Sequence, residues 1–498
     1  MKRLLLFVFL MCGMTLHAQP RFDAVQRHNP WNAGSNASGL RADSISLSYA
    51  DLGLEVGNGG FVDYSSSDQS LKLQARTESI RHFKRLSFAG HFSYTYFDAE
   101  NMSGSMFLNP NYYPVDILEF TPGRKIRETY DLGGVVAADF NARWTGGLRI
   151  DFKAENYAKR KDLRHQNRAL DLKVMPSVSY HVGQWRLGAS YLYMKNSERV
   201  SAKEVGTSAE SYQAFFDKGL LFGVLERWDG NGTHLDETGS GISGFPVSEQ
   251  GHGAGIQCQY AGLYAELMGI RRTGKTGEKG FHWHQFQATD YVVRMAYAIN
   301  SRHTLRLEMK FTDGENEENI LKKETVNGIS QPVYYGSNPI FQYRNNTLRL
   351  SYELDLPQKF NLQAAFDWTG DEQQSTLYYP YVKRQTMDVF RAELMTMVVC
   401  RAWEVSMGGF FQKGRSQERD FEQESDLETT AYPQQLTDYF RYRNEYRTAS
   451  RLGLCMGVRH HIRAFYIDLT ARYEHGFRLR YVAQPNHLQT ILTLGYNF

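Results

Sequence analysis

The stretch that decides the fold reads LQTILTLGYNF and runs from Leu488 to Phe498. Its even positions carry Leu, Thr, Leu, Leu, Tyr and Phe, whereas its odd positions carry Gln, Ile, Thr, Gly and Asn. Because successive side chains of a β-strand point to opposite faces, this alternation predicts a strand with one apolar face. We therefore expect the chain to end in an amphipathic strand.

The same two-residue period recurs upstream of this strand. Leu86–Tyr96, Trp144–Phe152 and His303–Phe311 each alternate apolar or aromatic residues with polar or charged ones. The composition agrees, because 14% of the residues are aromatic and 43 glycines stand against 13 prolines, which favours strands and turns. No repeat of fixed period is visible, which argues against a propeller or a solenoid. We predict an all-β chain.

Very short connections alternate with long polar ones between the predicted strands. Asp98–Lys125, Asp313–Ile340 and Arg415–Asp438 are examples of the long ones. The short ones lie near Lys84, Arg143, Gly183, Ser301, Pro357, Arg401 and His460. Transmembrane barrels of the bacterial outer membrane have short periplasmic turns and long extracellular loops. The asymmetry therefore predicts such a barrel and fixes its direction.

The number of strands follows from parity. About 17 segments can be read as strands, but the number should be even when both ends of the chain lie in the periplasm. The turn directions agree if one more strand lies between Glu198 and Gly253, and Ala214–Trp228 is the best candidate. We predict an antiparallel barrel of about 18 strands over residues 44–498, or about 16 if Ser44–Val56 is not part of the wall.

The placement of aromatic residues indicates which medium the apolar face meets. In a soluble β-sandwich, the alternative, that face would be turned inward. In these hairpins, however, aromatic residues open the apolar face beside the short turn and close it at the loop end, which is typical of the two membrane interfaces. The residues at the turn end are Trp144, Trp185, Phe360 and Trp403, and those at the loop end are Tyr96, Tyr193, Trp368 and Phe411.

The opposite face carries charges of both signs, for example Lys72 with Glu78 and Arg349 with Glu353. A basic side chain that faced lipid near the midplane would cost about 2–4 kcal/mol, so this face should line the lumen. Because the two signs are balanced, neither a strongly anion-selective nor a strongly cation-selective pore is indicated. A net charge of +3 likewise gives no field that would attract nucleic acid.

The N-terminus has the layout of a cleavable secretory signal. Lys2 and Arg3 precede the apolar run Leu4–Met14, and Ala18 precedes Gln19, so we expect residues 1–18 to be removed. A lipid-anchored form is the minor alternative. Residues 19–43 are polar and are expected to form a periplasmic tail or a plug inside the lumen. The cysteines that remain indicate neither a disulfide framework nor a metal site; they are Cys258, Cys400 and Cys455.

Two short motifs resemble those of known proteins. Leu494, Tyr496 and Phe498 resemble the C-terminal signature of outer-membrane proteins, which implies barrel-assembly machinery as a partner and outer-membrane lipid as the surroundings. Asn29–Leu40 resembles the opening of fatty-acid-transporter-type barrels and of some secretion-associated barrels. This second resemblance implies that residues 19–43 act as an N-terminal hatch and that the ligands are apolar. The chain as a whole resembles an uncharacterised family of bacterial outer-membrane β-barrels.

Several polar residues are predicted to face the lumen as candidate binding residues. His282 and His284 are two apart and should share a strand face with Asp290 and Arg294. The histidines could supply two metal ligands, but Asp290 would lie about 20 Å further along the strand, so no metal or other cofactor is expected. Ordinary lumenal polar residues are the alternative. The full candidate set is His282, His284, Asp290, Arg294, Arg472 and Glu474.

The sequence favours transport over catalysis. No serine, histidine and carboxylate have a spacing typical of a hydrolase, so we do not expect an enzyme. The first hypothesis is a barrel that carries a solute across the outer membrane. The second is a scaffold for a secretion or nutrient-uptake complex, with another outer-membrane or surface protein as partner. An outer-membrane enzyme is the third.

Overall fold

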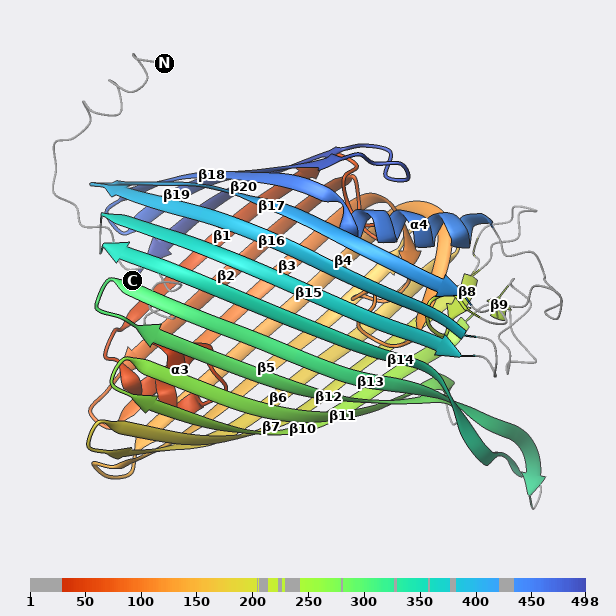
Figure 1. Ribbon diagram of the computed structural model, residues 1–498, viewed down its shortest axis with the longest axis horizontal. Coiled ribbons are helices and arrows are strands. Elements are labelled where there is room, and N and C mark those ends of the chain that lie inside the picture. The colour runs from red at the N-terminus through yellow and green to blue at the C-terminus, as the bar shows by residue number, and fades with distance from the viewer. Residues whose placement is uncertain are drawn as a thin grey trace, which may run out of the picture.

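The computed structural model is a closed antiparallel β-barrel (Figure 1). It describes residues 29–203, 205, 214–222, 226–228, 242–278, 281–326, 329–356, 359–376, 382–420 and 434–498. The predicted signal peptide, residues 1–18, and residues 19–28 lie outside this part of the chain. The predicted 18-stranded wall is confirmed. The barrel is long, with its short turns at one end and its loops at the other.

The wall strands follow one another around the barrel in chain order. They are β1 (Leu47–Asn58), β2 (Gln69–His82), β3 (Leu86–Ser105), β4 (Asp116–Asp139), β5 (Trp144–Lys159), β6 (Arg164–Val182), β7 (Trp185–Lys203), β10 (Ile242–Tyr260), β11 (Leu263–Glu278), β12 (Phe281–Ala298), β13 (His303–Val326), β14 (Ile329–Leu356), β15 (Phe360–Thr376), β16 (Val382–Cys400), β17 (Trp403–Asp420), β18 (Ser450–Ile462), β19 (Phe465–Phe477) and β20 (Asn486–Asn497). Residues 44–56 therefore do contribute a wall strand.

The final strand closes the barrel. β20 pairs antiparallel with β19 on one side and with β1 on the other, where Leu494 lies opposite Leu52. The backbone N–H of Phe498 then donates to the carbonyl of Ser48 at 3.0 Å. Closure leaves no free strand edge among the wall strands, as a membrane barrel requires because lipid cannot satisfy backbone hydrogen bonds.

The missing strand is not the one expected. β10 (Ile242–Tyr260) completes the wall by pairing with β7 and β11, and only its first part lies in the predicted interval. Ala214–Trp228 contains β8 (Ala214–Asp217) and β9 (Glu226–Trp228), which pair with β4 and with each other outside the wall. The turn after β10 is Ala261–Gly262, and it carries no proline, asparagine or aspartate to mark it. The apolar residues around Phe215 form a buried interior of the loops instead.

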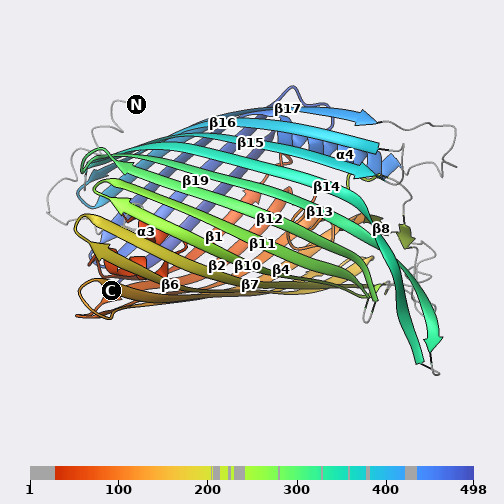
Figure 2. The ribbon, with the colours of Figure 1, turned by 60° about the horizontal axis from the view of Figure 1, so that its bottom comes forward.

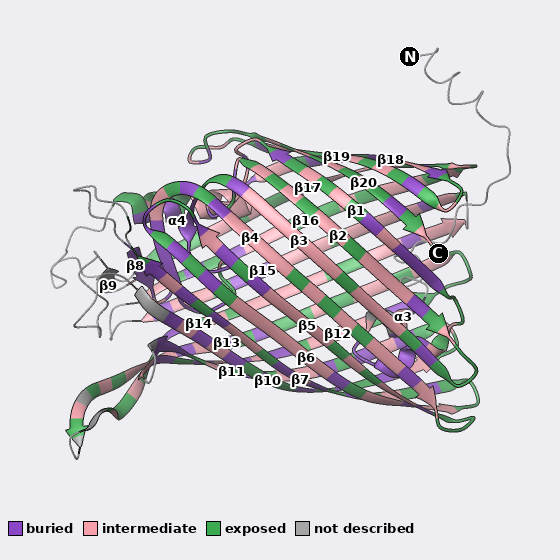
Figure 3. Ribbon diagram, turned by 180° about the vertical axis from the view of Figure 1, so that it is seen from behind, coloured by how far each residue is buried: buried purple, intermediate pink, exposed green. Residues whose placement is uncertain are grey.

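The outward face of the wall is apolar and exposed (Figure 3). Leu52 is 62% exposed, Ile256 64% and Leu494 50%, whereas lumenal neighbours such as Asp51 and Gln257 are buried. Exposed apolar side chains on every second residue around a closed barrel are the mark of a wall that meets lipid. None of the described helices is long and apolar enough to cross a membrane.

The strands continue well past the membrane at the loop end. β13 and β14 form a hairpin that projects beyond the rest of the barrel (Figure 2). Much of the predicted loops Asp98–Lys125 and Asp313–Ile340 is therefore strand. The helix α4 (Gln434–Thr448) lies at the same end, whereas the short helices α3 (Pro30–Ala33) and η1 (Ala37–Ala42) lie at the turn end.

Candidate functional site

Residues 29–43, which we call the inner segment, lie inside the barrel at the turn end and contact strands of the wall. Asn29 accepts a hydrogen bond from the N–H of Trp31 at 3.1 Å and caps α3, with Pro30 at its first turn. Asn36 caps η1 in the same way, accepting from the N–H of Ser38 at 3.0 Å. These two helix N-cap residues lie within eight residues of each other and stabilise the local fold of this short polar stretch. Its few apolar residues would not be enough to fold it.

The inner segment is bound to the wall by a buried polar network. The N–H of Ser35 donates to the Glu266 carboxylate at 3.0 Å, and its hydroxyl lies 2.8 Å from that of Ser190. The side-chain amide of Asn36 donates to Gln257 at 2.9 Å. Glu266 also forms an ion pair with Arg294 at 3.2 Å. The contact depends on wall glycines, since a Cβ on Gly147 would lie 2.4 Å from the backbone nitrogen of Ser38.

Trp31 is the main apolar anchor of the inner segment. It is 1% exposed, its indole N–H donates to Gln259 at 2.5 Å, and its ring packs edge-on against Tyr264. The Arg186 guanidinium lies 4.4 Å from the ring centroid, a cation–π contact, and donates to the carbonyl of Ser38 at 3.1 Å. Arg41 fastens the other end through Asp139 and the carbonyl of Phe83.

The middle of the lumen is lined by ion pairs, most of them between neighbouring strands and one within β16. Arg349 and Asp367 lie 3.1 Å apart, and the Arg349 side chain is 46% exposed, so this part of the lumen is open to water. Further pairs are Lys72–Glu55, Arg76–Asp51, Arg306–Glu353, Arg391–Glu393 and Arg459–Asp468. The predicted mixed-charge lumen is therefore present. Its charges are largely paired with one another, which gives no uniform field for one sign of solute.

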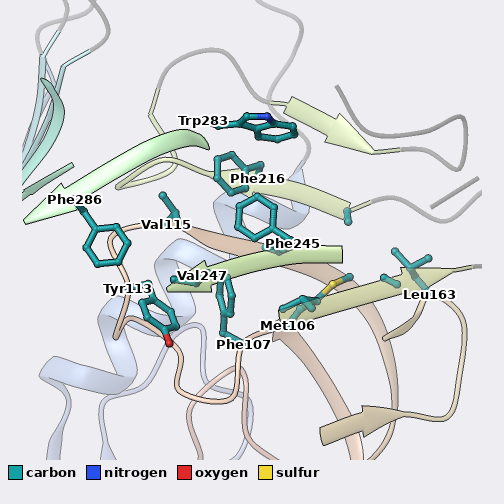
Figure 4. Close-up of a cluster of buried hydrophobic side chains, with 14 residues drawn as sticks. Met106, Phe107, Tyr113, Val115, Leu163, Phe216, Phe245, Val247, Trp283 and Phe286 are labelled. Atoms are coloured by element: carbon teal, nitrogen blue, oxygen red, sulfur yellow. The ribbon is translucent and has the colours of Figure 1, made fainter. Parts of the chain in front are cut away.

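The loops at the loop end form a cap with its own apolar interior (Figure 4). Met106 and Phe107 from the β3–β4 loop and Phe216 from β8 pack on lumen-facing residues of the wall, among them Phe245 and Trp283. All of these side chains are at most 6% exposed. The cap is thus built like the core of a soluble domain, in contrast to the hydrogen-bonded inner segment.

The helix α4 completes the cap. Leu436 and Tyr439 of α4 are buried against Leu118 and Phe215. The Glu445 carboxylate accepts hydrogen bonds from the backbone N–H groups of Arg480, Tyr481 and Val482 at 2.6–2.7 Å. The β19–β20 loop is therefore tied to the same cap as β8.

Two buried aspartates face each other in the cap, outside the membrane. Asp116 at the outer tip of β4 lies opposite Asp217 of β8 in the strand register. Burial, assisted by the Asp217 carboxylate, raises the pKa of Asp116 to about 7. Burial likewise raises the pKa of Asp217, although the N–H groups of Gly219 and Leu221 donate to it. Oδ2 of Asp116 is buried and has no hydrogen-bond partner among the residues that the structure describes.

The predicted binding residues do not form one site. Asp290 accepts from Arg272 at 2.8 Å in a network with Glu249 beneath the cap, whereas Arg294 pairs with Glu266 at the inner segment. Glu474 pairs with Arg451 on another side of the barrel, and Arg472 is exposed on the lumenal face of β19. Their role in binding stays a prediction.

The two histidines do not share an open lumenal face as the spacing suggested. His284 is buried, with its ring 5.3 Å from that of Phe216, whereas the backbone of His282 bonds to Tyr334. A register shift between β11 and β12 explains the difference, because it turns the intervening Trp283 into the cap as well. Among the described residues no group of three or more histidine, cysteine or carboxylate side chains could hold a metal ion.

The aromatic residues of the two predicted belts lie at two different positions along their strands. Trp144, Trp185, Phe360 and Trp403 are the first residues of β5, β7, β15 and β17 at the turn end. Trp144 packs on Tyr180, Trp185 on Tyr260 and Trp403 on His460, with ring centroids 4.0–4.7 Å apart. Tyr96, Tyr193, Trp368 and Phe411 lie further along their strands, towards the loop end. Their role as membrane belts stays an interpretation.

Sequence reasoning missed the residues that hold the inner segment. Glu266, Gln257 and Ser190 lie on three separate wall strands, and only the strand register brings them together. The sequence did point to Asn29–Leu40, whose polar and small residues make the matching contacts from the inner segment to the wall. Which wall residues they meet could not be read from the period of the strands.

Comparisons with known proteins identify one family and several solved structures of low sequence identity. A family model described as "Family of unknown function (DUF6850)" matches residues 37–498. No curated protein matches. Among solved structures, the chain is similar to the ferric preacinetobactin receptor of Acinetobacter baumannii, with 9% identity, a TM-score of 0.40, and coverage of 92% of this chain and 80% of that one.

Two further structures give similar values. The ferric enterobactin receptor of Pseudomonas aeruginosa has 8% identity, a TM-score of 0.42, and coverage of 92% and 82%. An iron transporter of Neisseria meningitidis has 9% identity, a TM-score of 0.44, and coverage of 93% and 83%. With TM-scores below 0.5, no argument about the function of this chain rests on these likenesses.

Proposed function

The chain belongs to the family of unknown function DUF6850, and from this premise we propose that it is an outer-membrane barrel that admits a solute when its inner segment leaves the lumen. In this proposal residues 29–43 are the plug of the barrel and the wet, charged middle of the lumen is the path. The cleaved signal peptide at residues 1–18 belongs to the same proposal, because the barrel must be exported to reach the membrane.

The observation that supports this proposal is the way in which the inner segment is bound. Its contacts to the wall include many hydrogen bonds, among them those from Ser35 and Asn36 to Glu266 and Gln257, and its large buried apolar side chains are Trp31 and Leu40. Water can replace such hydrogen bonds, and each contributes only about 0.5–1.5 kcal/mol net. The wall, in contrast, is held by backbone hydrogen bonds between every pair of neighbouring strands. The inner segment can therefore leave without unfolding the barrel.

A disulfide lock tests the movement directly. The hydroxyls of Ser35 and Ser190 lie 2.8 Å apart, so Ser35→Cys with Ser190→Cys, in a chain with its other cysteines replaced, should join the inner segment to β7. Current across a planar bilayer is measured before and after reduction. We expect few or no channel openings in the oxidised protein and recovery on reduction.

The matched control joins two wall strands instead. Ser48 and Ser79 have hydroxyls 2.6 Å apart on β1 and β2, so Ser48→Cys with Ser79→Cys forms a comparable cross-link that leaves the inner segment free. Its oxidation should not change the current. Deletion of residues 29–43 should give a permanently open channel, and a deletion variant without current would contradict the transport proposal.

A scaffold role is the second candidate, and the cap favours it. Its apolar interior from loops, β8 and α4 is rigid enough to present a surface to another protein, and no movement of it is needed. The two functions are separated by the same deletion variant. A scaffold would keep a closed lumen and would co-purify with a partner from mild detergent.

A further inference from the structure

A cavity lies between the inner segment and the wall at the turn end, where α3 is seen inside the barrel (Figure 1). Its volume is about 590 Å³, within the range of about 300–1,000 Å³ that small-molecule sites have. Residues 29–31 and 41–43 of the inner segment line one side of it, and the β6–β7 turn with Arg186, Gln259 and Ala261 lines the other. The cavity therefore has this shape only while the inner segment is in place.

Arg186 brings a positive charge to this cavity. It is 5% exposed, and its guanidinium contacts two neutral groups, the carbonyl of Ser38 at 3.1 Å and the ring of Trp31. Its Nε is buried without a hydrogen-bond partner among the described residues, and none of their carboxylates forms an ion pair with it. Burial of a charged group is costly unless an opposite charge accompanies it. An anion in the cavity would supply that charge.

The carboxylates around the cavity have partners of their own. Asp139 forms an ion pair with Arg41 at 2.5 Å. Asp43, which lines the cavity, accepts a hydrogen bond from Asn29 at 2.7 Å. Neither carboxylate is paired with Arg186, so the positive charge there is compensated only at longer range.

His181 places a second polar group beside Arg186. The two residues lie opposite each other on β6 and β7. The His181 side chain is half-buried and lines the cavity, and its ring forms no hydrogen bond with the part of the chain that the structure describes. A neutral imidazole donates one hydrogen bond. Ile45 and Trp185, both partly exposed, add apolar surface to the same cavity.

We propose that this cavity binds a small organic solute with one carboxylate or phosphate group, and that the bound solute holds the inner segment in the lumen. Arg186 and His181 donate to the oxyanion, because a guanidinium matches such oxygens with charge-assisted hydrogen bonds. The organic part of the solute lies against Ile45 and Trp185. A ligand that binds only one arrangement of a protein stabilises that arrangement, and here it includes the inner segment. The binding is independent of transport, whereas its effect on a current rests on the proposed function.

The first experiment measures binding of a probe with a single charged group. We titrate para-fluorobenzoate into the full mature protein in a neutral detergent and follow it by fluorine NMR. The uncharged control of the same shape is para-fluorobenzamide, and para-fluorophenyl phosphate is the phosphate form. We expect saturable binding of an anionic probe and none of the amide. Equal binding of the amide, or displacement of the anionic probe by small amounts of phosphatidylglycerol, would overturn the proposal of a soluble anion.

Two arginine variants locate the site. Arg186→Gln should weaken binding of the anionic probe by more than about tenfold, because hydrogen bonds to a charged group are lost. Arg459→Gln is the matched control, since Arg459 is another lumenal arginine near the turn end and is paired with Asp468 at 2.8 Å. Equal affinity in both variants would show that the anion binds elsewhere.

Gln184 provides the same test without changing a contact of the inner segment. It is exposed in the β6–β7 turn and lines the cavity. Gln184→Lys should strengthen binding of the anionic probe and Gln184→Glu should weaken it, each by about threefold, as expected for charges near the surface. Equal affinities in these two variants would contradict the site even if Arg186→Gln fails to hold the inner segment.

Hydrogen exchange tests the effect on the inner segment. The anionic probe should slow the exchange of backbone amides in residues 31–43 and leave those of β18 and β19 unchanged. Saturation with the probe without this protection would refute the stabilising role. In planar bilayers, the probe added at the turn end should make openings less frequent. A protein that is protected by the probe but never conducts supports this site and contradicts only the transport proposal.

Discussion

At the scale of single residues, Glu266 decides how firmly the inner segment is held. Its carboxylate accepts from the N–H and the hydroxyl of Ser35 and pairs with Arg294, and its side chain is fully buried. The carboxylate therefore serves the plug and the wall together. A neutral or shorter side chain would leave buried donors without acceptors, which is more costly than the loss of a surface pair.

We predict that Glu266→Ala loosens the inner segment and leaves the wall intact. The cost should be about 1–3 kcal/mol, because Ser35 and Arg294 lose a buried acceptor. The frequency of channel openings in planar bilayers should rise, while heat-modifiable migration stays normal. Glu393→Gln is the control, since Glu393 pairs with Arg391 in the half-exposed middle of the lumen. If both variants open equally often, the inner segment is not what closes the channel.

A second residue-scale prediction concerns pH. Asp116 has its pKa raised by burial to about 7 in the folded cap, against an ordinary value of 3.8. A raised pKa means that folding favours the protonated form, so its contribution is fully present below about pH 4 and is lost as the pH rises through 7. We expect backbone amides of β8 to exchange faster at pH 8 than at pH 5 after correction for the intrinsic rate. The opening free energy should be lower at pH 8 by about 3 kcal/mol at most.

The same measurement on two variants separates Asp116 from other groups. Asp116→Asn removes this carboxyl, so the pH dependence of exchange should become much weaker and leave only the contribution of Asp217, whose pKa burial also raises. Glu100→Gln, at an exposed carboxylate of β3, should keep the pH dependence of the unchanged protein. A pH dependence that is undiminished in Asp116→Asn would assign the effect to another group.

At the scale of elements, β8 and β10 show what alternation can and cannot distinguish. Parity predicts one more strand between Glu198 and Gly253, with Ala214–Trp228 as its candidate, and this candidate contains Phe215, Phe216 and Leu221. These side chains instead fill the cap, where every face is buried and the two-residue period has no meaning. β10 is the strand that parity requires, but only its first part lies in the predicted interval, and a turn of two residues, Ala261–Gly262, separates it from β11.

The cap should respond to truncation of Phe216 as a soluble core does. Phe216 is 1% exposed and packs against Phe245 and Trp283, so Phe216→Ala leaves a cavity that costs about 3–5 kcal/mol. Hydrogen exchange should increase in β8 and at the outer tip of β4 but not around the wall. Phe366→Ala is the control, because Phe366 is 42% exposed on the outward face of β15. If hydrogen exchange in the cap does not change in Phe216→Ala, the packing of Phe216 does not stabilise the cap.

At the scale of the whole molecule, the sequence was most informative where the fold is periodic. The barrel, its 18 strands and the direction of its turns follow from alternation, turn length and parity, and all three hold over the full wall. The contacts of Ser35 with Glu266 and the folding of the loops into a cap could not be predicted. They depend on register across several strands and on packing between distant segments, for which one sequence provides no periodic signal.

The final strand provides the last prediction, because it closes the barrel and also carries the predicted assembly signature. Phe498 is 58% exposed, and it stacks on Tyr496 without being buried, so the finished barrel gains little from its ring. If Leu494, Tyr496 and Phe498 act as the assembly signature, Phe498→Ala should lower the amount of barrel in the outer membrane of cells several-fold. The same variant refolded in detergent should show normal heat-modifiable migration. Phe465→Ala is the matched control, since Phe465 is 60% exposed and packs on the same Tyr496. Equal losses in both variants, or a refolding defect in Phe498→Ala, would mean that Phe498 matters for packing rather than for recognition.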